Sequence, residues 1–138
     1  MRILRLAIVL SFLSQIVSAC GCPDIGVPSV IEMTLPASTG ESPYTVELCI
    51  DSSCEVFEQV QEGVATSSDG EAELEVLSSN SLRYTSWRQI APGTHDIAVN
   101  ISSEGGAVAT YDGAVEFDQV DRCHDEASEA TIELDPSG

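Results

Sequence analysis

The chain has 138 residues with 23 acidic and only five basic side chains, so its formal net charge at pH 7 is −18. This composition excludes nucleic-acid binding through phosphates, which needs clustered lysine or arginine, and it excludes attraction to an anionic membrane by charge. The length suits one domain after removal of a leader, and a domain of this size buries about 60–70% of the surface of its unfolded chain.

Residues 1–19 have the pattern of a cleaved export signal. Arg2 and Arg5 precede the apolar run LAIVLSFLSQIV at 6–17. As a helix this run would span roughly 18 Å, whereas the hydrocarbon core of a bilayer needs about 30 Å. The run therefore predicts a signal-peptide core rather than a membrane span, with a short buried helix as the alternative.

The leader ends on Val17-Ser18-Ala19-Cys20, which resembles the bacterial lipobox, although Val17 departs from its commonest first residue. The resemblance implies that the Cys20 thiol receives a diacylglycerol and that Cys20 becomes the first residue of the mature protein. An ordinary signal peptidase could also cut after Ala19 and leave Cys20 unmodified. Five cysteines is an odd number, and lipid on Cys20 would leave four for disulfides in an oxidising compartment. We therefore predict an exported protein, anchored by lipid at the cell membrane or outer envelope.

Residues 20–29 predict a lipidated tether, and residues 30–135 predict a single β domain. Apolar and polar side chains alternate in five segments, at 30–35, 44–50, 71–77, 94–101 and 130–135. A period of two with one polar face is typical of half-buried antiparallel strands. Turn residues separate the segments at 36–43, 66–70, 78–81, 91–93 and 102–106. We expect seven or eight strands in a single antiparallel β-sandwich.

Two further segments leave alternatives open. In CEVFEQVQEG at 54–63, Val56 and Val60 have helical spacing, and a strand that buries them leaves Phe57 facing outward. We expect a strand that leaves a hairpin here. LRYTSWRQI at 82–90 is consistent with a strand buried on both faces or with a strand followed by an irregular loop.

Three segments resemble parts of a known family: GTHDIAV at 93–99, CIDSSC at 49–54 and DRCHDEASEATIEL at 121–134. They are similar to a Gly-Thr-Tyr strand, a two-cysteine hairpin and the closing stretch of transthyretin-like, carboxypeptidase-regulatory-like domains in bacterial lipoproteins. In that family a Gly-Tyr pair commonly follows the Gly-Thr-Tyr strand, whereas this chain has residues 102–106 in its place. The resemblance implies an Ig-like, transthyretin-like sandwich on a surface lipoprotein without catalytic residues.

The four remaining cysteines are Cys22, Cys49, Cys54 and Cys123, and they allow three pairings. We favour Cys49–Cys54 across a hairpin together with Cys22–Cys123. The second bridge would close a loop of about 100 residues, worth about 4.7 kcal/mol in the chain-entropy model. A zinc site built from Cys22, Cys123 and His124 competes, but these spacings match no compact zinc motif and export favours disulfides.

The other candidate ligands are carboxylates and histidines. Asp118, Asp121, Asp125 and Glu126 lie close together in sequence and are weak calcium candidates, because calcium is bound by oxygen atoms, although no EF-hand pattern is present. His95 lies on the apolar side of its segment, where we expect a core-edge histidine with a hydrogen bond.

The sequence therefore predicts a non-catalytic binding or structural module on the extracytoplasmic side of the cell envelope. It implies no cofactor, a membrane contact made by the lipid anchor, and an unknown protein or glycan as partner. One alternative is a calcium-stabilised acidic surface domain. Another is a small exported hydrolase, which would need His95 or His124 beside a nucleophile and a carboxylate; no serine lies in a Gly-x-Ser-x-Gly elbow.

Overall fold

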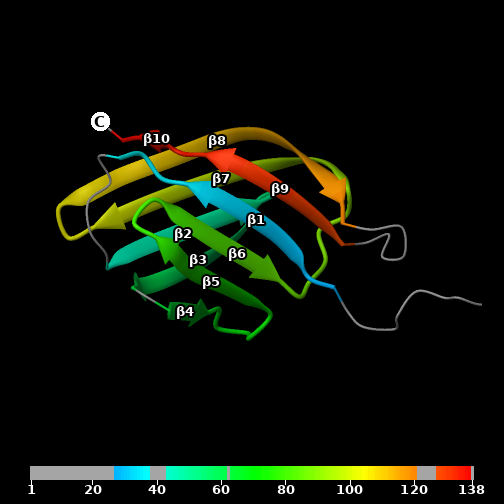
Figure 1. The fold of residues 1–138 in the computed structure, drawn as a ribbon, viewed down its shortest axis with the longest axis horizontal. Helices are drawn as coiled ribbons and strands as arrows, with labels where there is room; N and C mark the ends of the chain where they lie inside the picture. The colour runs from blue at the N-terminus through cyan, green and yellow to red at the C-terminus, as the bar shows by residue number, and fades with distance from the viewer. Residues whose placement is uncertain (1–26, 38–42, 62, 121–126, 138) are drawn as a thin grey trace, which may run out of the picture.

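A computed structural model describes residues 27–37, 43–61, 63–120 and 127–137 (Figure 1). All elements in these ranges are strands, which confirms the predicted all-β class: β1 (Ser29–Thr34), β2 (Tyr44–Ile50), β3 (Ser53–Val60), β4 (Gly63–Thr66), β5 (Ala72–Ser78), β6 (Ser81–Ser86), β7 (Gly93–Ser103), β8 (Gly106–Gln119), β9 (Ser128–Glu133) and β10 (Asp135–Pro136). The described residues contain no helix with the length and apolarity of a membrane span.

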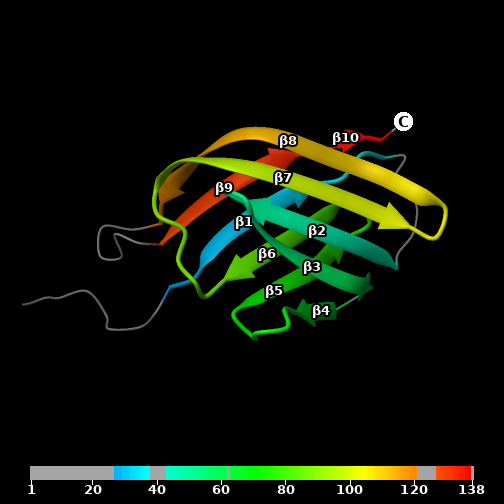
Figure 2. The ribbon, with the colours of Figure 1, turned by 180° about the vertical axis from the view of Figure 1, so that it is seen from behind.

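The strands belong to one curled sheet. Its order is β3-β2-β7-β8-β9-β1-β6-β5-β4, and β10 pairs with the first half of β8. The two ends of this order, β3 and β4, approach each other, so the sheet is nearly closed into a barrel around the core (Figures 1 and 2).

The expected antiparallel sandwich of seven or eight strands is wrong in strand number and in strand direction. The described residues form ten strands, and β1 runs parallel to β9, with Val30 opposite Glu129 and Met33 opposite Ile132. The long β8 pairs with β7 over most of its length and reaches β9 only at Asp118 and Gln119. Because β8 links the two parts in this way, the sheet is one mixed curl rather than two separate antiparallel sheets.

The core is built by the alternation that the sequence shows. In the predicted strands, side chains two residues apart point to the same side and are buried. These buried side chains are Ile31, Met33, Leu35, Tyr44, Val46, Leu48, Ala72, Leu74, Ile97, Val99, Ile101, Ile132 and Leu134. Burial of each larger aliphatic side chain contributes about 1.5–3 kcal/mol, so this set drives the sheet to curl around itself.

β3 departs from simple alternation. Phe57 is 2% exposed and Val60 is buried, whereas Val56 is 51% exposed. Between Phe57 and Val60 the pairing with β2 shifts by one residue, and Gln59 has a φ of 55°. A bulge with one extra residue turns both Phe57 and Val60 toward the core. The segment is a strand as expected, but the expectation that Phe57 faces outward is wrong.

Two connections position the candidate site. Asp51 and Ser52 form the two-residue turn between β2 and β3, and both have positive φ, 48° and 73°, as a type I′ turn requires. β6 ends at Ser86, and an irregular segment at 87–92 leads to β7. Of the two alternatives for residues 82–90, the strand followed by a loop is therefore correct.

Candidate functional site

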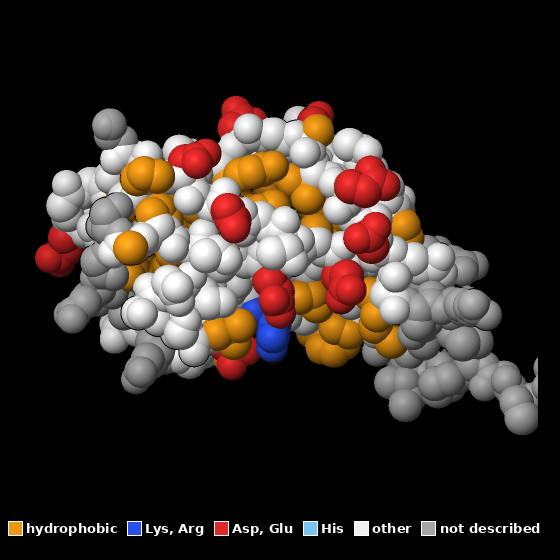
Figure 3. Space-filling view, turned by 45° about the horizontal axis from the view of Figure 1, so that its top comes forward, with side chains coloured by type: hydrophobic (Ala, Val, Ile, Leu, Met, Phe, Trp, Pro, Cys, Tyr) orange, Lys and Arg blue, Asp and Glu red, His pale blue; other side chains and the backbone are white. Residues whose placement is uncertain are grey.

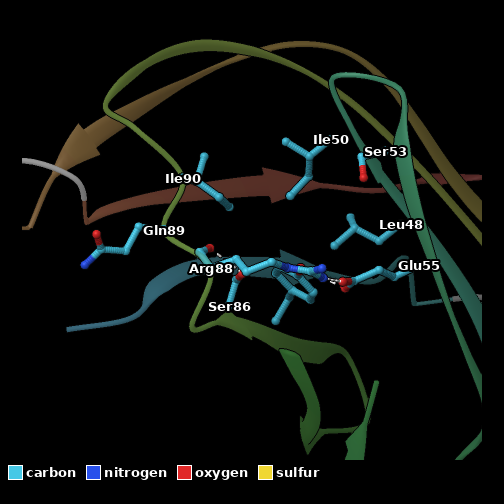
Figure 4. A pocket seen from close by; sticks show the side chains of 9 residues that line it. Leu48, Ile50, Ser53, Glu55, Ser86, Arg88, Gln89 and Ile90 are labelled. Atoms are coloured by element: carbon cyan, nitrogen blue, oxygen red, sulfur yellow. Dashed lines mark hydrogen bonds and ion pairs between the residues drawn. The ribbon is translucent and has the colours of Figure 1, made fainter. Parts of the chain in front are cut away.

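The candidate site is a divided hollow around Arg88, where the β2–β3 hairpin, the 87–92 segment and the β4–β5 turn meet. Figure 4 shows the compartment between the hairpin and the 87–92 segment. The Arg88 guanidinium forms an ion pair with Glu55 on β3. Its other terminal nitrogen lies 2.7 Å from Asp69 Oδ2 in the β4–β5 turn. One cation therefore connects three pieces of the chain that are far apart in sequence.

Glu55 is the more enclosed carboxylate of this cluster. Its side chain is 17% exposed, against 54% for the Arg88 side chain. The Tyr84 hydroxyl donates a hydrogen bond to Glu55 Oε2 at 2.9 Å, so both carboxylate oxygens are engaged. Burial raises the pKa of Tyr84, and the phenol therefore remains a hydrogen-bond donor at neutral pH.

One compartment of the site has aliphatic walls. Its volume is about 220 Å³, and Leu48 and Ile50 of β2 face Ile90 of the 87–92 segment across it (Figure 4). The rest of the lining is more polar and comprises Ser53, Glu55, Tyr84, Ser86, Arg88 and Gln89. This side of Arg88 can receive an apolar group.

The second compartment is polar. Its volume is about 300 Å³, and it lies between the first half of β3 and the β4–β5 turn. The lining comprises Ser53, Cys54, Glu55, Val56, Ser67, Ser68, Asp69 and Arg88. Arg88, Glu55 and Ser53 line both compartments, so the ion pair forms the boundary between an apolar and a polar space.

The β4–β5 turn holds Asp69 in place. Asp69 Oδ1 accepts hydrogen bonds from the Glu71 backbone N–H at 2.9 Å and from the Ser67 hydroxyl at 2.7 Å. These two bonds lower the pKa of Asp69. Ser67 Oγ in turn accepts a bond from the Ala72 N–H at 3.0 Å. The turn thus presents an ionised carboxylate oxygen to Arg88.

Three buried serines hold the segment that carries Arg88. Ser29 Oγ on β1 accepts a hydrogen bond from the Ile90 N–H at 2.8 Å, and Ser128 Oγ on β9 donates to the Ile90 carbonyl. Ser86 Oγ at the end of β6 donates to the Arg88 carbonyl at 2.5 Å. Irregular backbone at 88–90 is thereby tied to three strands, which fixes the guanidinium relative to the sheet.

His95 links the β2–β3 turn to the 87–92 segment. Its Nδ1 lies 2.5 Å from Asp51 Oδ2 and its Nε2 lies 2.6 Å from the Ala91 carbonyl oxygen. The hydrogen bond with Asp51 raises the pKa of His95 and lowers the pKa of Asp51. Since Asp51 follows Ile50 and Ala91 follows Ile90, this histidine connects the two walls. The expectation of a core-edge histidine with a hydrogen bond is confirmed.

A separate hollow of about 470 Å³ lies on the outer side of β1, β8 and β9. Four carboxylates line it: Glu32, Glu116, Asp118 and Glu129. Two of them are engaged: Arg83 forms an ion pair with Glu32 at 2.9 Å, and the Thr94 hydroxyl donates to Glu116 at 2.6 Å. In the part of the chain that the structure describes, no three His, Cys, Asp or Glu side chains are grouped so as to hold a metal.

The predicted site residues fall into two groups. Cys49 and Cys54 face each other across β2 and β3, with sulfur atoms 1.98 Å apart, which is the disulfide that the sequence favoured. Most of the other predicted residues lie outside the described ranges: Cys20, Cys22, Asp121, Cys123, His124, Asp125 and Glu126. The lipid anchor, the second disulfide, the zinc alternative and most of the calcium candidates therefore remain predictions.

The sequence did not predict the Arg88 cluster. The only hint is that arginine is scarce, because three arginines follow residue 19 in a chain with 23 acidic residues. A rare cation in such a chain is expected to be paired, but its partners Glu55 and Asp69 become neighbours only when the sheet curls.

No protein-family model, curated protein or solved structure matches this chain. The transthyretin-like resemblance therefore stays a prediction.

Proposed function

We propose that the protein is a non-catalytic binding module held on the extracytoplasmic side of the cell envelope by lipid on Cys20. The leader pattern at 1–19 and the lipobox-like Val17–Cys20 stretch support export and anchoring. The tether at 20–29 would join the lipid to the folded domain.

The divided hollow around Arg88 is the observation that supports a binding role. It joins an aliphatic space to a polar one, and the side chains between them are held by hydrogen bonds from several strands. A rigid site loses little side-chain entropy when a ligand binds. Trp87, which is 51% exposed, precedes Arg88 in the chain, and exposed aromatic side chains are common anchors for partners.

Binding fits this site better than catalysis because its charged side chains and the Tyr84 and Ser86 hydroxyls are bonded within the protein. A hydrolase needs a nucleophile within hydrogen-bond reach of a base. The Ser86 hydroxyl donates to a backbone carbonyl, and the two ring nitrogens of His95 face Asp51 and Ala91 rather than a serine.

Anchoring is tested by Cys20→Ser with Cys22→Ser as the matched control, expressed in a bacterial host with labelled palmitate. We expect the wild type and Cys22→Ser to carry the label and to fractionate with membranes. Cys20→Ser should carry no label and leave the membrane fraction. A Cys20→Ser protein that matures and stays with the membranes would rule out lipid on Cys20.

A calcium-stabilised surface domain is the second candidate, because four carboxylates line one hollow outside β1, β8 and β9. It differs from the first candidate in one measurable property, since it requires a melting temperature that rises specifically with calcium.

A further inference from the structure

β3 is an edge strand with one side open. It stands at the end of the strand order, and β2 is its strand partner within the described residues. The Cα atoms of Cys49 and Cys54 are 4.0 Å apart, which is the short spacing of a non-hydrogen-bonded antiparallel pair. Hydrogen-bonded and non-hydrogen-bonded pairs alternate along an antiparallel ladder. The pair of Glu47 and Val56, two residues further along, is therefore also a non-hydrogen-bonded pair. The backbone N–H and C=O groups of Cys54 and Val56 therefore point away from β2.

These backbone groups point toward the polar compartment, which separates the first half of β3 from the β4–β5 turn. At the far end of β3 the gap closes, because β4 begins at Gly63, soon after β3 ends at Val60. Figures 1 and 2 show β3 and β4 close at that end and diverging from it. The bulge at Gln59 also interrupts regular pairing there, so the open edge is confined to the first half of β3.

The surroundings of this edge are acidic and include an exposed aliphatic side chain. Glu55 and Glu58 lie on β3, Asp69 and Glu71 lie in or beside the β4–β5 turn, and Arg88 is the cation among them. Val56 on β3 is 51% exposed at this edge, whereas Val64, which is 55% exposed, lies on β4 near the end where the gap closes. A second copy of the chain is a poor occupant, because each copy carries a formal charge of −18.

We infer that the first half of β3 binds an extended peptide segment with basic side chains, which adds to the sheet as a further strand. This inference rests on the proposed function, since it names the class of partner for the binding module. The peptide backbone pairs with the outward groups of Cys54 and Val56, as in other strand additions. Its aliphatic side chains lie beside Val56 and its basic side chains lie near Glu58 and Asp69, where opposite charges across neighbouring strands attract.

The probe is a short, end-blocked peptide of alternating lysine and valine, added to the full-length chain purified in nonionic detergent. Trp87 is the single tryptophan and reports binding by its fluorescence. We expect a saturable change that weakens as ionic strength rises, because screening reduces the attraction between exposed charges. The same peptide with glutamate in place of lysine, or with every backbone nitrogen methylated, should give no saturable change.

The matched variants are Val56→Pro and Val56→Ala. Proline removes the outward N–H while leaving the N–H groups that bond to β2, and alanine removes the side chain but keeps the N–H. We expect proline to weaken binding of the lysine–valine peptide about tenfold relative to alanine, the effect of one or two lost hydrogen bonds. If Val56→Pro does not fold, the methylated peptide on the wild-type chain decides the same question.

The inference is overturned if the lysine–valine peptide does not bind, if the methylated peptide binds equally well, or if folded Val56→Pro and Val56→Ala bind alike. If one of these results is obtained and membrane association still depends on Cys20, the inference about β3 fails and the proposed anchoring stands. Loss of that association with peptide binding intact would instead overturn the anchoring and leave the β3 edge as a binding site.

Discussion

His95 is the side chain whose charge state affects the site most directly. Its ring nitrogens face the Asp51 carboxylate on the hairpin tip and the Ala91 carbonyl. Glu116 on β8 adds further negative potential and favours the imidazolium, while Asp96 on β7 donates its backbone N–H to Asp51. Because the imidazolium donates to both acceptors, protonation strengthens the connection between the two walls of the aliphatic compartment.

The pair of His95 and Asp51 predicts a pH-dependent stability. The pKa of His95 is raised above 6.5, so its contribution is complete below pH 6.5 and is lost as the pH rises through the raised value. The pKa of Asp51 is lowered from 3.8, so its contribution is complete above pH 3.8 and is lost as the pH falls through the lowered value. The pair therefore stabilises the fold most between pH 3.8 and 6.5.

We expect the melting temperature of the wild type to exceed that of His95→Gln most in this acidic window and less at alkaline pH. Glutamine can hydrogen-bond but does not titrate, so it isolates the effect of the charge. Thermal unfolding of both proteins across the pH range measures the difference. A difference of the same size at pH values below and above neutrality would argue against the charged pair.

Residues such as His95 could be placed from sequence because their burial depends on the alternation within one strand. Arg88 could not, because 33 residues separate it from Glu55 and the contact depends on how far the sheet curls. The serines that hold the 88–90 backbone were missed for the same reason: Ser29 and Ile90 are 61 residues apart.

At the level of the strand, irregularities decide which surfaces are presented. The bulge in β3 buries Phe57 and Val60 and leaves Val56 exposed at the open edge. Without the extra residue, the side chains at 57 and 60 would point to opposite faces, because side chains alternate along a regular strand. The bulge thus supplies two core side chains and limits the open edge to the first half of the strand.

Truncation of neighbouring β3 side chains tests this register. Phe57→Ala should lower the free energy of unfolding by about 3–5 kcal/mol, because it removes a buried aromatic side chain and leaves a cavity. Val56→Ala should change it by less than about 0.5 kcal/mol, as for other exposed positions. Urea unfolding of the two variants gives both values. A larger loss for Val56→Ala than for Phe57→Ala would show that the register is wrong.

Strands with clean alternation, such as β2 and β7, were predictable, whereas β4 and β8 were not recognised. β4 has only four residues, too few for a period to stand out. β8 points Tyr111 and Gly113 inward between the buried Ala109 and Val115, so its inner face is not uniformly apolar in the sequence. The parallel pairing of β1 with β9 could not be predicted either, because the alternation of side chains does not specify the relative direction of two strands.

At the scale of the whole molecule, the chain carries a large excess of negative charge, with 23 acidic and five basic side chains. Figure 3 shows acidic side chains scattered over one face with neutral and apolar surface between them. The two arginines of the described residues, Arg83 and Arg88, are both in ion pairs. Most carboxylates therefore repel one another through solvent, and this repulsion opposes the compact state.

Screening should therefore stabilise the fold without requiring a particular cation. We expect the melting temperature to rise with sodium chloride, and to rise equally with calcium chloride at matched ionic strength, because both salts screen exposed charges. Thermal unfolding in the two salts makes the comparison. A rise at low calcium concentration that sodium cannot reproduce would favour the calcium-stabilised domain instead.

The intact mass of the mature protein tests the central claim, that Cys20 is acylated and becomes the amino terminus of an anchored binding module. We predict a mass equal to residues 20–138 with a diacylglycerol group on the Cys20 sulfur, reduced by the two hydrogens lost in the Cys49–Cys54 disulfide and by two more if Cys22 and Cys123 are joined. The mass of an unmodified chain, beginning at either Met1 or Cys20, would contradict it.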